Sequence, residues 1–283
     1  LRSLMRMGFE IRQKHYDAVL NFHASPSSSK MALATGAKIR AVHFHGHQDR
    51  NRFSTVDIPG KGTLKPIIER DMDVIRSLGF TVPEGRLPVV HLTDSEKQNA
   101  ETRMGSKGSW LGLGLGASRA TKSWGLERFA EIALRWTNEG GKVLGLVGPD
   151  EVELGQRFKQ LTAHAAPRSI VIETGLQIRE LAAVISQCKV FFGNDSGPRH
   201  LAVAVGIPTL TVFGPEDPFE WHPYSQVQHP YLFQPGLACR KDGLPGYPAW
   251  CGLSECVIEK HRCMTDITPQ QAWDKLQTLK GRS

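Results

Sequence analysis

Apolar positions along the chain alternate between two spacings, one typical of short buried strands and one typical of amphipathic helices. From about residue 110 onward the two spacings follow each other regularly, strand then helix. This order predicts a parallel, doubly wound sheet whose ligand crevice lies at the carboxyl ends of the strands. The predicted strands are 110–114, 142–147, 169–173, 190–193 and 209–213, and the predicted helices are 126–139, 152–163, 178–186 and 200–204.

The first 85 residues show the same alternation, with helices expected at 4–16, 27–35 and 63–78 and strands at 17–22 and 39–44. A polar segment then contains a helix, 95–104, capped by Asp94 or Ser95, and ends in a stretch rich in Gly and Ser. We place a domain boundary here, which predicts a first domain of residues 1–104 and a second of residues 105–283.

Length and composition agree with a globular protein of two domains: 283 residues, 40% hydrophobic and 22% charged. The longest apolar runs are far shorter than the roughly 18 residues of a membrane span, and charged residues interrupt the first ten positions. We therefore expect neither a transmembrane helix nor a signal peptide, and a cytoplasmic location. Because the chain begins with Leu1 and enters a helix at once, we also expect it to be truncated.

The net charge of +7 indicates an anionic partner. Since the chain lacks a Lys/Arg block of the kind that marks nucleic-acid tails, a phosphorylated substrate or a lipid surface fits better than nucleic acid.

The strongest candidate for chemistry is the segment 191–200, FFGNDSGPRH, which passes from a buried strand through a polar loop into a helix. Such a loop presents backbone N–H groups and a helix N-terminus to an anion, typically a phosphate. His200 lies about one helical turn beyond Ser196 and would face the same pocket. Asp195 and Ser196 are also ordinary N-cap residues, which is the structural alternative for either one.

A second cluster, 114–124, has the same order of strand, polar loop and helix start. Lys122 supplies a positive charge, and Ser118 and Thr121 supply hydroxyl donors, which together suit a diphosphate. The alternative is a solvated loop whose Ser123 caps the following helix.

Glu151, after the next strand, could accept hydrogen bonds from a ribose diol, or it could be a helix residue favoured by the macrodipole.

Residues 112–117 also satisfy the dinucleotide pattern G-x-G-x-x-A. We consider this match weak, because its glycines fall inside the predicted strand instead of after it.

Four cysteines, Cys239, Cys251, Cys256 and Cys263, lie within 25 residues with the spacing C-x11-C-x4-C-x6-C. In a reducing cytoplasm they would be free thiols or zinc ligands, although the spacing contains no C-x2-C pair.

The loop 46–62, preceded by His43, His45 and His47, is a candidate for acceptor contact, and a solvent-facing role for these histidines is the alternative.

The segments 193–202, 206–209 and 213–218 together resemble the signature of glycosyltransferase family nine, the ADP-heptose:lipopolysaccharide heptosyltransferases. Residues 116–130 are similar to the family's G-A-S-x-x-x-K-x-W-x-x-E-x-F element. The resemblance implies a GT-B fold, an α/β architecture of two Rossmann-like doubly wound domains, of which the first would be incomplete here.

The resemblance also implies roles for single residues. Ser118 and Lys122 would hold the diphosphate of the donor and Glu151 its ribose. Asp195, Ser196, Gly197 and His200 would surround its phosphates and sugar, and we add Thr121 to this donor set from the loop chemistry above. The first domain would bind the acceptor and the second, with its C-terminal helix, the donor.

By the same resemblance, heptose would pass from ADP-heptose to an anionic lipid A core acceptor with inversion, without a metal ion or another cofactor. The family's general base is an Asp in an S-x-x-G-D motif, which would lie before Leu1, so we assign no catalytic residue. The expected protein is a monomer in peripheral contact with the inner membrane.

Two other classes of function remain to be weighed. A nucleotide-sugar binding module without catalytic activity would bind the donor without transfer. An NAD-dependent oxidoreductase would need an acid at the end of the second strand of this domain aimed at a ribose, and it would leave Lys122 and His200 unexplained.

Overall fold

The computed structural model describes residues 2–23, 25–43, 52–58, 65–105, 108–240, 250–258 and 260–281. The chain forms two compact units. The first contains Leu1–Arg86 together with Phe219–Pro223, and the second contains Leu87–Pro218, Tyr224–Asp242 and Ala249–Ser283.

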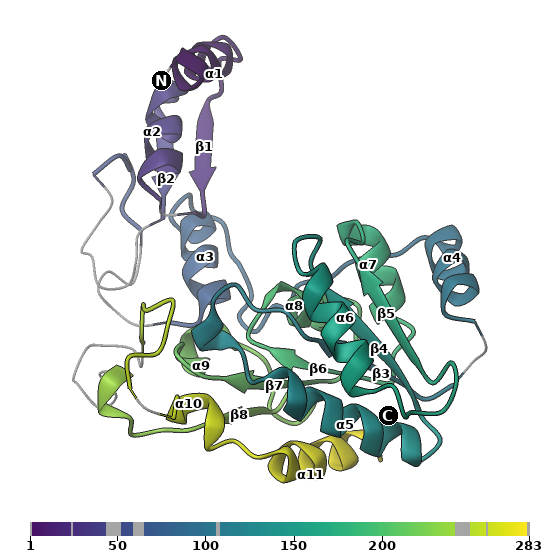
Figure 1. Ribbon diagram of the computed structural model, residues 1–283. Helices are drawn as coiled ribbons and strands as arrows, with labels where there is room; N and C mark the ends of the chain where they lie inside the picture. The colour runs from purple at the N-terminus through teal and green to yellow at the C-terminus, as the bar shows by residue number, and fades with distance from the viewer. Residues whose placement is uncertain are drawn as a thin grey trace. The chain divides into compact units, whose positions relative to one another are not determined.

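The second unit is built on a parallel sheet with the strand order β5-β4-β3-β6-β7-β8 (Figure 1). Five of these strands were predicted from the apolar runs, and β8 was not. The strands are β3 (Trp110–Gly114), β4 (Lys142–Val147), β5 (Ile170–Thr174), β6 (Val190–Asn194), β7 (Thr209–Phe213) and β8 (Tyr231–Phe233).

Helices cover both faces of this sheet, so its central strands are buried on two sides. The α-helices of this part of the chain are α4 (Asp94–Met104), α5 (Leu126–Asn138), α6 (Val152–Leu161), α7 (Ile178–Ile185), α8 (Gly197–Ala204), α9 (Pro218–Trp221), α10 (Arg262–Thr265) and α11 (Pro269–Lys280), and two short 3-10 helices are η1 (Ala120–Lys122) and η2 (Ala238–Arg240).

The two cores of the second unit follow from strand alternation, because successive side chains of a strand point to opposite faces. Leu111 and Phe192 pack with buried residues of α5 and α11 on one face. Trp110 and Phe191 pack with α4, α7 and α8 on the other. In Figure 1, α5 and α11 lie below the strands, and α4 and α7 lie above them.

Two predicted helix starts are corrected by the structure. The helix predicted from residue 95 has Thr93 as its N-cap, with a capping box to Glu96, in place of a cap at Asp94 or Ser95. The helix predicted at 200–204 begins earlier, at Gly197, because Pro198 in the first turn has a φ angle already suited to the helix.

The two units divide at Arg86 and Leu87, not at the predicted boundary between residues 104 and 105. The physical reason is that α4 packs on α7: Ala100 and Met104 are buried in the core of the second unit, and Arg179 pairs with Glu96 at 2.5 Å. The polar composition of α4 reflects its exposed face and concealed this packing.

The first unit contains a two-stranded parallel sheet, β1 (Ala18–Asn21) and β2 (Ile39–Val42), with helices α1 (Arg2–Arg12), α2 (Pro26–Ala34) and α3 (Ile67–Arg76). Its strands and helices agree with the predicted order. Within this unit, Arg70 of α3 pairs with Glu220 at 2.7 Å, which explains how a segment 150 residues away joins it.

His43, proposed as an acceptor contact or a solvent-facing residue, is buried at 2% exposure, with Nε2 4.0 Å from Asp71. Burial raises the pKa of Asp71 to about 6, against a smaller opposing effect of Arg70. The solvent-facing alternative is therefore wrong for His43. His45 and His47 lie outside the described residues, as does much of the loop 46–62.

Among the described residues, no helix combines the length and the apolar character needed to cross a membrane, as the sequence predicted.

Candidate functional site

Most of the predicted site residues lie in the segments that follow β3 and β6, neighbouring strands in the middle of the sheet. The chain leaves β3 toward β4 on one side and leaves β6 toward β7 on the other. Parallel sheets open a crevice at such a topological switch point, and ligands commonly bind there.

Asn194, the last residue of β6, fixes the loop that follows β3. Its side chain is fully buried, accepts a hydrogen bond from the backbone N–H of Trp124 at 2.9 Å, and donates to the carbonyl of Leu115 at 3.0 Å. Trp124 is itself fully buried and packs edge-on against Phe129 and Phe192. The loop that carries Lys122 is thus held at both its beginning and its end.

A cluster of ion pairs occupies the switch point. Nζ of Lys122 lies 2.6 Å from Oδ2 of Asp195, while Nη2 of Arg199 lies 2.7 Å from Oδ1 of the same carboxylate. Asp195 and Arg199 are buried, at 5% and 1% exposure. Burial raises the pKa of Asp195, but the charges of Arg199 and Lys122 outweigh it, so the pKa lies below its ordinary value.

A second pair extends this cluster toward β7. Arg119 pairs with Glu216, whose Oε1 also lies 4.0 Å from Nζ of Lys122. Burial raises the pKa of Glu216 above its ordinary value, partly offset by Lys122 and Arg119. The whole cluster contains two carboxylates and three cations: Asp195 and Glu216, and Lys122, Arg119 and Arg199. The surplus positive charge suits an anionic ligand.

The start of α8 stands beside this cluster. Ser196 is its N-cap residue, but the Ser196 side chain makes no capping hydrogen bond and instead donates to the carbonyl of Asn194 at 3.3 Å. Ser196 therefore occupies the N-cap position, as the structural alternative predicted, but its hydroxyl does not cap the helix. Gly197 is exposed, and a Cβ atom there would have no neighbour within 4 Å. An anion can therefore approach the backbone of this helix end closely.

Glu151 lies at the end of β4, directly before α6. Its Oε2 accepts a hydrogen bond from the N–H of Gly148 at 2.7 Å. The carboxylate lies against Gly116, where a Cβ atom would collide with it. Glycine at 116 therefore lets the carboxylate of Glu151 approach the end of β3, on the side of the switch point opposite β6.

Gly112 and Gly114 lie inside β3 and are buried. Their place inside the strand was predicted, and it is the reason why the dinucleotide pattern was considered a weak match. A Cβ atom on Gly114 would lie 2.9 Å from the ring of Phe191. These glycines therefore serve the close packing of β3 on β6, not the approach of a pyrophosphate.

His200 is half-buried on α8, and its Nδ1 lies 2.5 Å from the hydroxyl of Tyr224. Tyr224 is 7% exposed, and its ring also packs edge-on against His229. His229 is buried, and burial lowers its pKa to about 4.

Two residues of the predicted donor set stand apart from the cluster. Thr121 is buried, and its hydroxyl donates to the carbonyl of Leu253 at 2.7 Å. The hydroxyl of Thr121, predicted to contact the donor, therefore donates its proton within the chain and anchors a later loop. Ser118 is exposed in the loop between β3 and η1.

Three charged members of the cluster were not among the residues predicted from the sequence: Arg119, Arg199 and Glu216. Arg199 carried a usable signal, since it follows Asp195 by four residues at the start of a helix, a spacing that favours an ion pair. Glu216 and Arg119 lie 97 residues apart in the sequence, and no local pattern connects them.

All five cysteines are free thiols. Burial raises the pKa of Cys263 to about 11, and the thiols of Cys239, Cys251 and Cys256 act in the same direction. In the described part of the chain, no group of three or more His, Cys, Asp or Glu side chains is arranged to hold a metal ion. The zinc alternative for the four-cysteine segment therefore gains no support.

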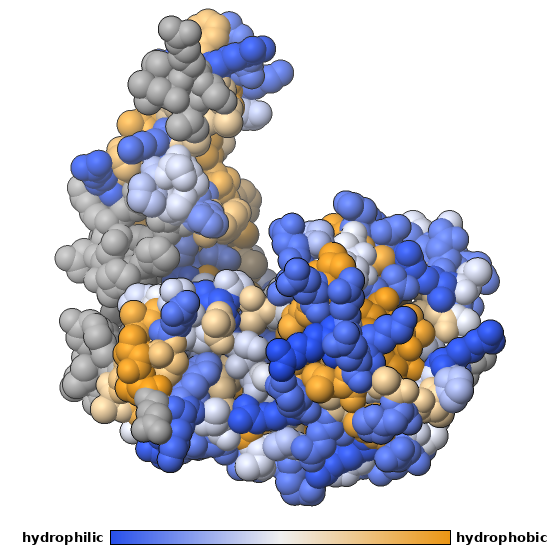
Figure 2. All heavy atoms as spheres, viewed as in Figure 1, coloured by the Kyte–Doolittle hydropathy of each residue, from blue (hydrophilic) through white to orange (hydrophobic). Residues whose placement is uncertain are grey.

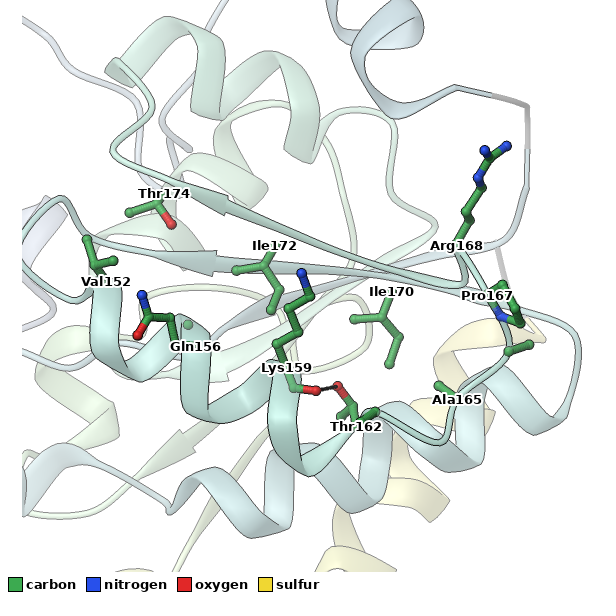
Figure 3. A pocket seen from close by; sticks show the side chains of 13 residues that line it. Val152, Gln156, Lys159, Thr162, Ala165, Pro167, Arg168, Ile170, Ile172 and Thr174 are labelled. Carbon is green, nitrogen blue, oxygen red and sulfur yellow. Dashed lines mark hydrogen bonds between the residues drawn. The ribbon is translucent and has the colours of Figure 1, made fainter.

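A separate groove of about 420 Å³ lies between α6 and β5 and contains none of the predicted site residues (Figure 3). Lys159 and Ile172 point into this groove, whereas Arg168 points away from it. On the face shown in Figure 2, apolar side chains appear among charged ones in this region. The residues that line this groove do not form a cluster of ion pairs like the one at the switch point.

Comparison with known proteins agrees with this geometry. Residues 4–242 match the model of glycosyltransferase family 9 (heptosyltransferase). Lipooligosaccharide heptosyltransferase 2 of Campylobacter jejuni is 29% identical over 170 residues, which are 60% of this chain and 51% of that protein. Lipopolysaccharide heptosyltransferase 2 of Escherichia coli K12 is 25% identical over 291 residues, with 97% of this chain and 78% of that protein covered.

The covered share of the relative differs from match to match. The chain spans about half the length of the two Campylobacter relatives. Among solved structures, E. coli ADP-heptose lps heptosyltransferase II superposes with a TM-score of 0.73 at 20% identity, covering 99% of this chain and 81% of that one. The glycosyl transferase family 9 protein of Veillonella parvula gives 0.73 at 22% identity, with 99% and 78% covered.

The structural likeness confirms the predicted GT-B fold. The family match covers most of the chain and includes both motif regions from which the resemblance was drawn. The chain therefore belongs to glycosyltransferase family 9, the heptosyltransferase family.

Proposed function

We propose that this protein transfers heptose, or a related sugar, from ADP-heptose to a lipopolysaccharide inner-core acceptor with inversion. The second unit would bind the donor and the first unit the acceptor. The observation that carries the proposal is the cluster at the switch point, where Lys122 and Arg199 flank Asp195 beside the open start of α8.

The chemistry of the proposed transfer explains this arrangement. As the bond between the sugar and the diphosphate breaks, negative charge develops on the departing phosphate. Fixed cations and backbone N–H groups stabilise such charge with little reorganisation. Lys122 and the backbone at Gly197 would meet the diphosphate, and His200 would lie beside it on α8.

The remaining donor contacts follow from position. Glu151, across the switch point from β6, would accept hydrogen bonds from the ribose, and Ser118 in the loop after β3 would reach the phosphates. Asp195 would act mainly by holding Lys122 and Arg199 in place, because both of its oxygens are already paired. We assign none of the described residues as the base that activates the acceptor hydroxyl.

The acceptor would be an anionic lipid A core, reached by peripheral contact with the inner membrane on its cytoplasmic side. A net charge of +7 supports attraction to an anionic surface. We propose that the protein acts as a monomer and binds no nucleic acid.

Calorimetric titration with ADP, UDP and NAD tests the donor assignment. We expect ADP to bind and NAD to bind at least about tenfold more weakly, because the glycines of β3 pack against Phe191 and are not available to a pyrophosphate. Selective binding of NAD would overturn the site. Binding of ADP without sugar transfer to lipid A core would favour the binding module without activity.

Metal removal provides a second test. We propose that transfer requires no metal ion, because Lys122, Arg119 and Arg199 would supply positive charge to the leaving group. Rates of heptose transfer measured with and without excess EDTA should agree within about twofold. A loss that added Mg²⁺ restores would contradict the proposal.

A further inference from the structure

The segment from Tyr224 to Tyr231 contributes two buried rings, Tyr224 and His229, which form a stack of three with the half-buried His200 of α8. The Tyr224 ring lies edge-on between the rings of His200 and His229, with centroid distances of 5.7 Å to each. On the far side of the stack, Nδ1 of His229 lies 3.1 Å from the hydroxyl of Thr209, the first residue of β7. Tyr224 is thereby fixed against a strand of the central sheet.

The hydroxyl of this fixed ring reaches one atom of the site, Nδ1 of His200, at 2.5 Å. A neutral histidine carries its proton on only one of its two ring nitrogens, and a hydrogen bond to one nitrogen decides which. A buried tyrosine hydroxyl that donates to Nδ1 therefore leaves the proton on Nε2.

We propose that Tyr224 is a positioning residue for His200: its hydroxyl donates to Nδ1 and so holds the ring as the tautomer protonated on Nε2, a donor for an oxygen of the bound diphosphate. The role in ligand binding rests on the proposed function. The choice of tautomer does not, because it concerns only the contact between the Tyr224 and His200 side chains.

The phenol of Tyr224 is able to donate this hydrogen bond. Burial raises the pKa of Tyr224 above its ordinary value, against a smaller effect of Arg199, so the phenol keeps its proton at neutral pH. The low pKa of His229, about 4, keeps the other ring of the stack neutral. His229 therefore carries no positive charge beside Tyr224 at neutral pH.

The tautomer can be read directly by nitrogen NMR of protein labelled with 15N-histidine at pH 8, where an ordinary histidine is neutral. The signals of His200 are identified by their absence in His200→Gln. In the unmodified protein we expect a protonated Nε2 and an unprotonated Nδ1. A proton on Nδ1 would overturn the proposal, and this reading needs no variant at Tyr224.

Tyr224→Phe removes only the hydroxyl and keeps the ring in the stack. We expect the His200 signals to move toward a mixture of both tautomers, whereas Tyr231→Phe, which removes a hydroxyl bonded to Gln226, should leave them unchanged. An unchanged tautomer in Tyr224→Phe would refute the positioning role.

ADP titration separates positioning from general packing. Tyr224→Phe should weaken ADP binding roughly two- to tenfold, the usual value of one hydrogen bond. In the His200→Gln background the same change should have almost no further effect, because Tyr224 acts through His200. An equal loss in both backgrounds would contradict the role. If no variant and no unmodified protein binds ADP, the proposed function fails, and the NMR result still decides the tautomer.

Discussion

Replacing Lys122 by Met is expected to lower the rate of sugar transfer about 100-fold or more and to weaken ADP binding in parallel. Lys122 places its ammonium group at the switch point, with the side chain only 14% exposed. Removing one fixed donor from a site that stabilises developing negative charge typically costs about 100- to 1000-fold in rate. The measurement combines a transfer assay with calorimetric titration of ADP.

The fold should survive this change, because Arg199 still pairs with Asp195 when Lys122 is absent. Thermal unfolding of the variant checks that expectation. Lys159→Met is the matched control: Lys159 is exposed on α6 in the groove of Figure 3, apart from the cluster, and its replacement should leave ADP binding unchanged. Equal ADP affinity in unmodified protein and Lys122→Met would overturn the donor assignment.

Replacing Arg199 by Met is expected to lower the free energy of unfolding by at most about 3–5 kcal/mol, the usual cost of breaking a buried ion pair, because Lys122 still pairs with the other oxygen of Asp195. Arg199 is 1% exposed, bonds Asp195 through two nitrogens, and lies over the ring of Phe213 at 4.9 Å. Urea unfolding followed by circular dichroism measures the change.

Arg157→Met is the control for this prediction. Arg157 pairs with Glu127, but both side chains are more than half exposed, so the loss should stay below about 1 kcal/mol. Similar losses in the two variants would show that burial of the Asp195 pair has no special weight.

The same pair sets an acid dependence with a definite sign. Because the folded pKa of Asp195 lies below its ordinary value, its contribution is fully present above the unfolded pKa of about 3.9. It is lost as pH falls through the folded pKa, since the unfolded state then binds the extra proton. In Arg199→Met the stability should fall less steeply at acid pH.

Much of the second unit could be predicted from local patterns. Strands such as Trp110–Gly114 and Thr209–Phe213 appear with the bounds expected from their apolar runs, because a strand covered on both faces needs continuous apolar side chains. The boundary of the two units was misplaced, because the charged face of α4 conceals the few apolar residues that join it to α7.

The composition of the site was predictable in part. That Lys122, Asp195 and Gly197 lie close together could be predicted, because each follows the end of a predicted strand. Thr121 carried the same signal but serves another purpose, since its hydroxyl faces Leu253. A hydroxyl in a loop does not reveal from sequence whether it faces a ligand or a carbonyl of the chain.

The sequence by itself determined that this protein has a doubly wound sheet with polar loops at the strand ends, and it pointed to the family, because strand periodicity and loop motifs are properties of neighbouring residues. Only the tertiary structure decided that Arg119 meets Glu216, that Lys122 meets Asp195, and that Tyr224 contacts His200. These contacts join residues from different loops, and they depend on the strand order that brings β3, β6 and β7 together.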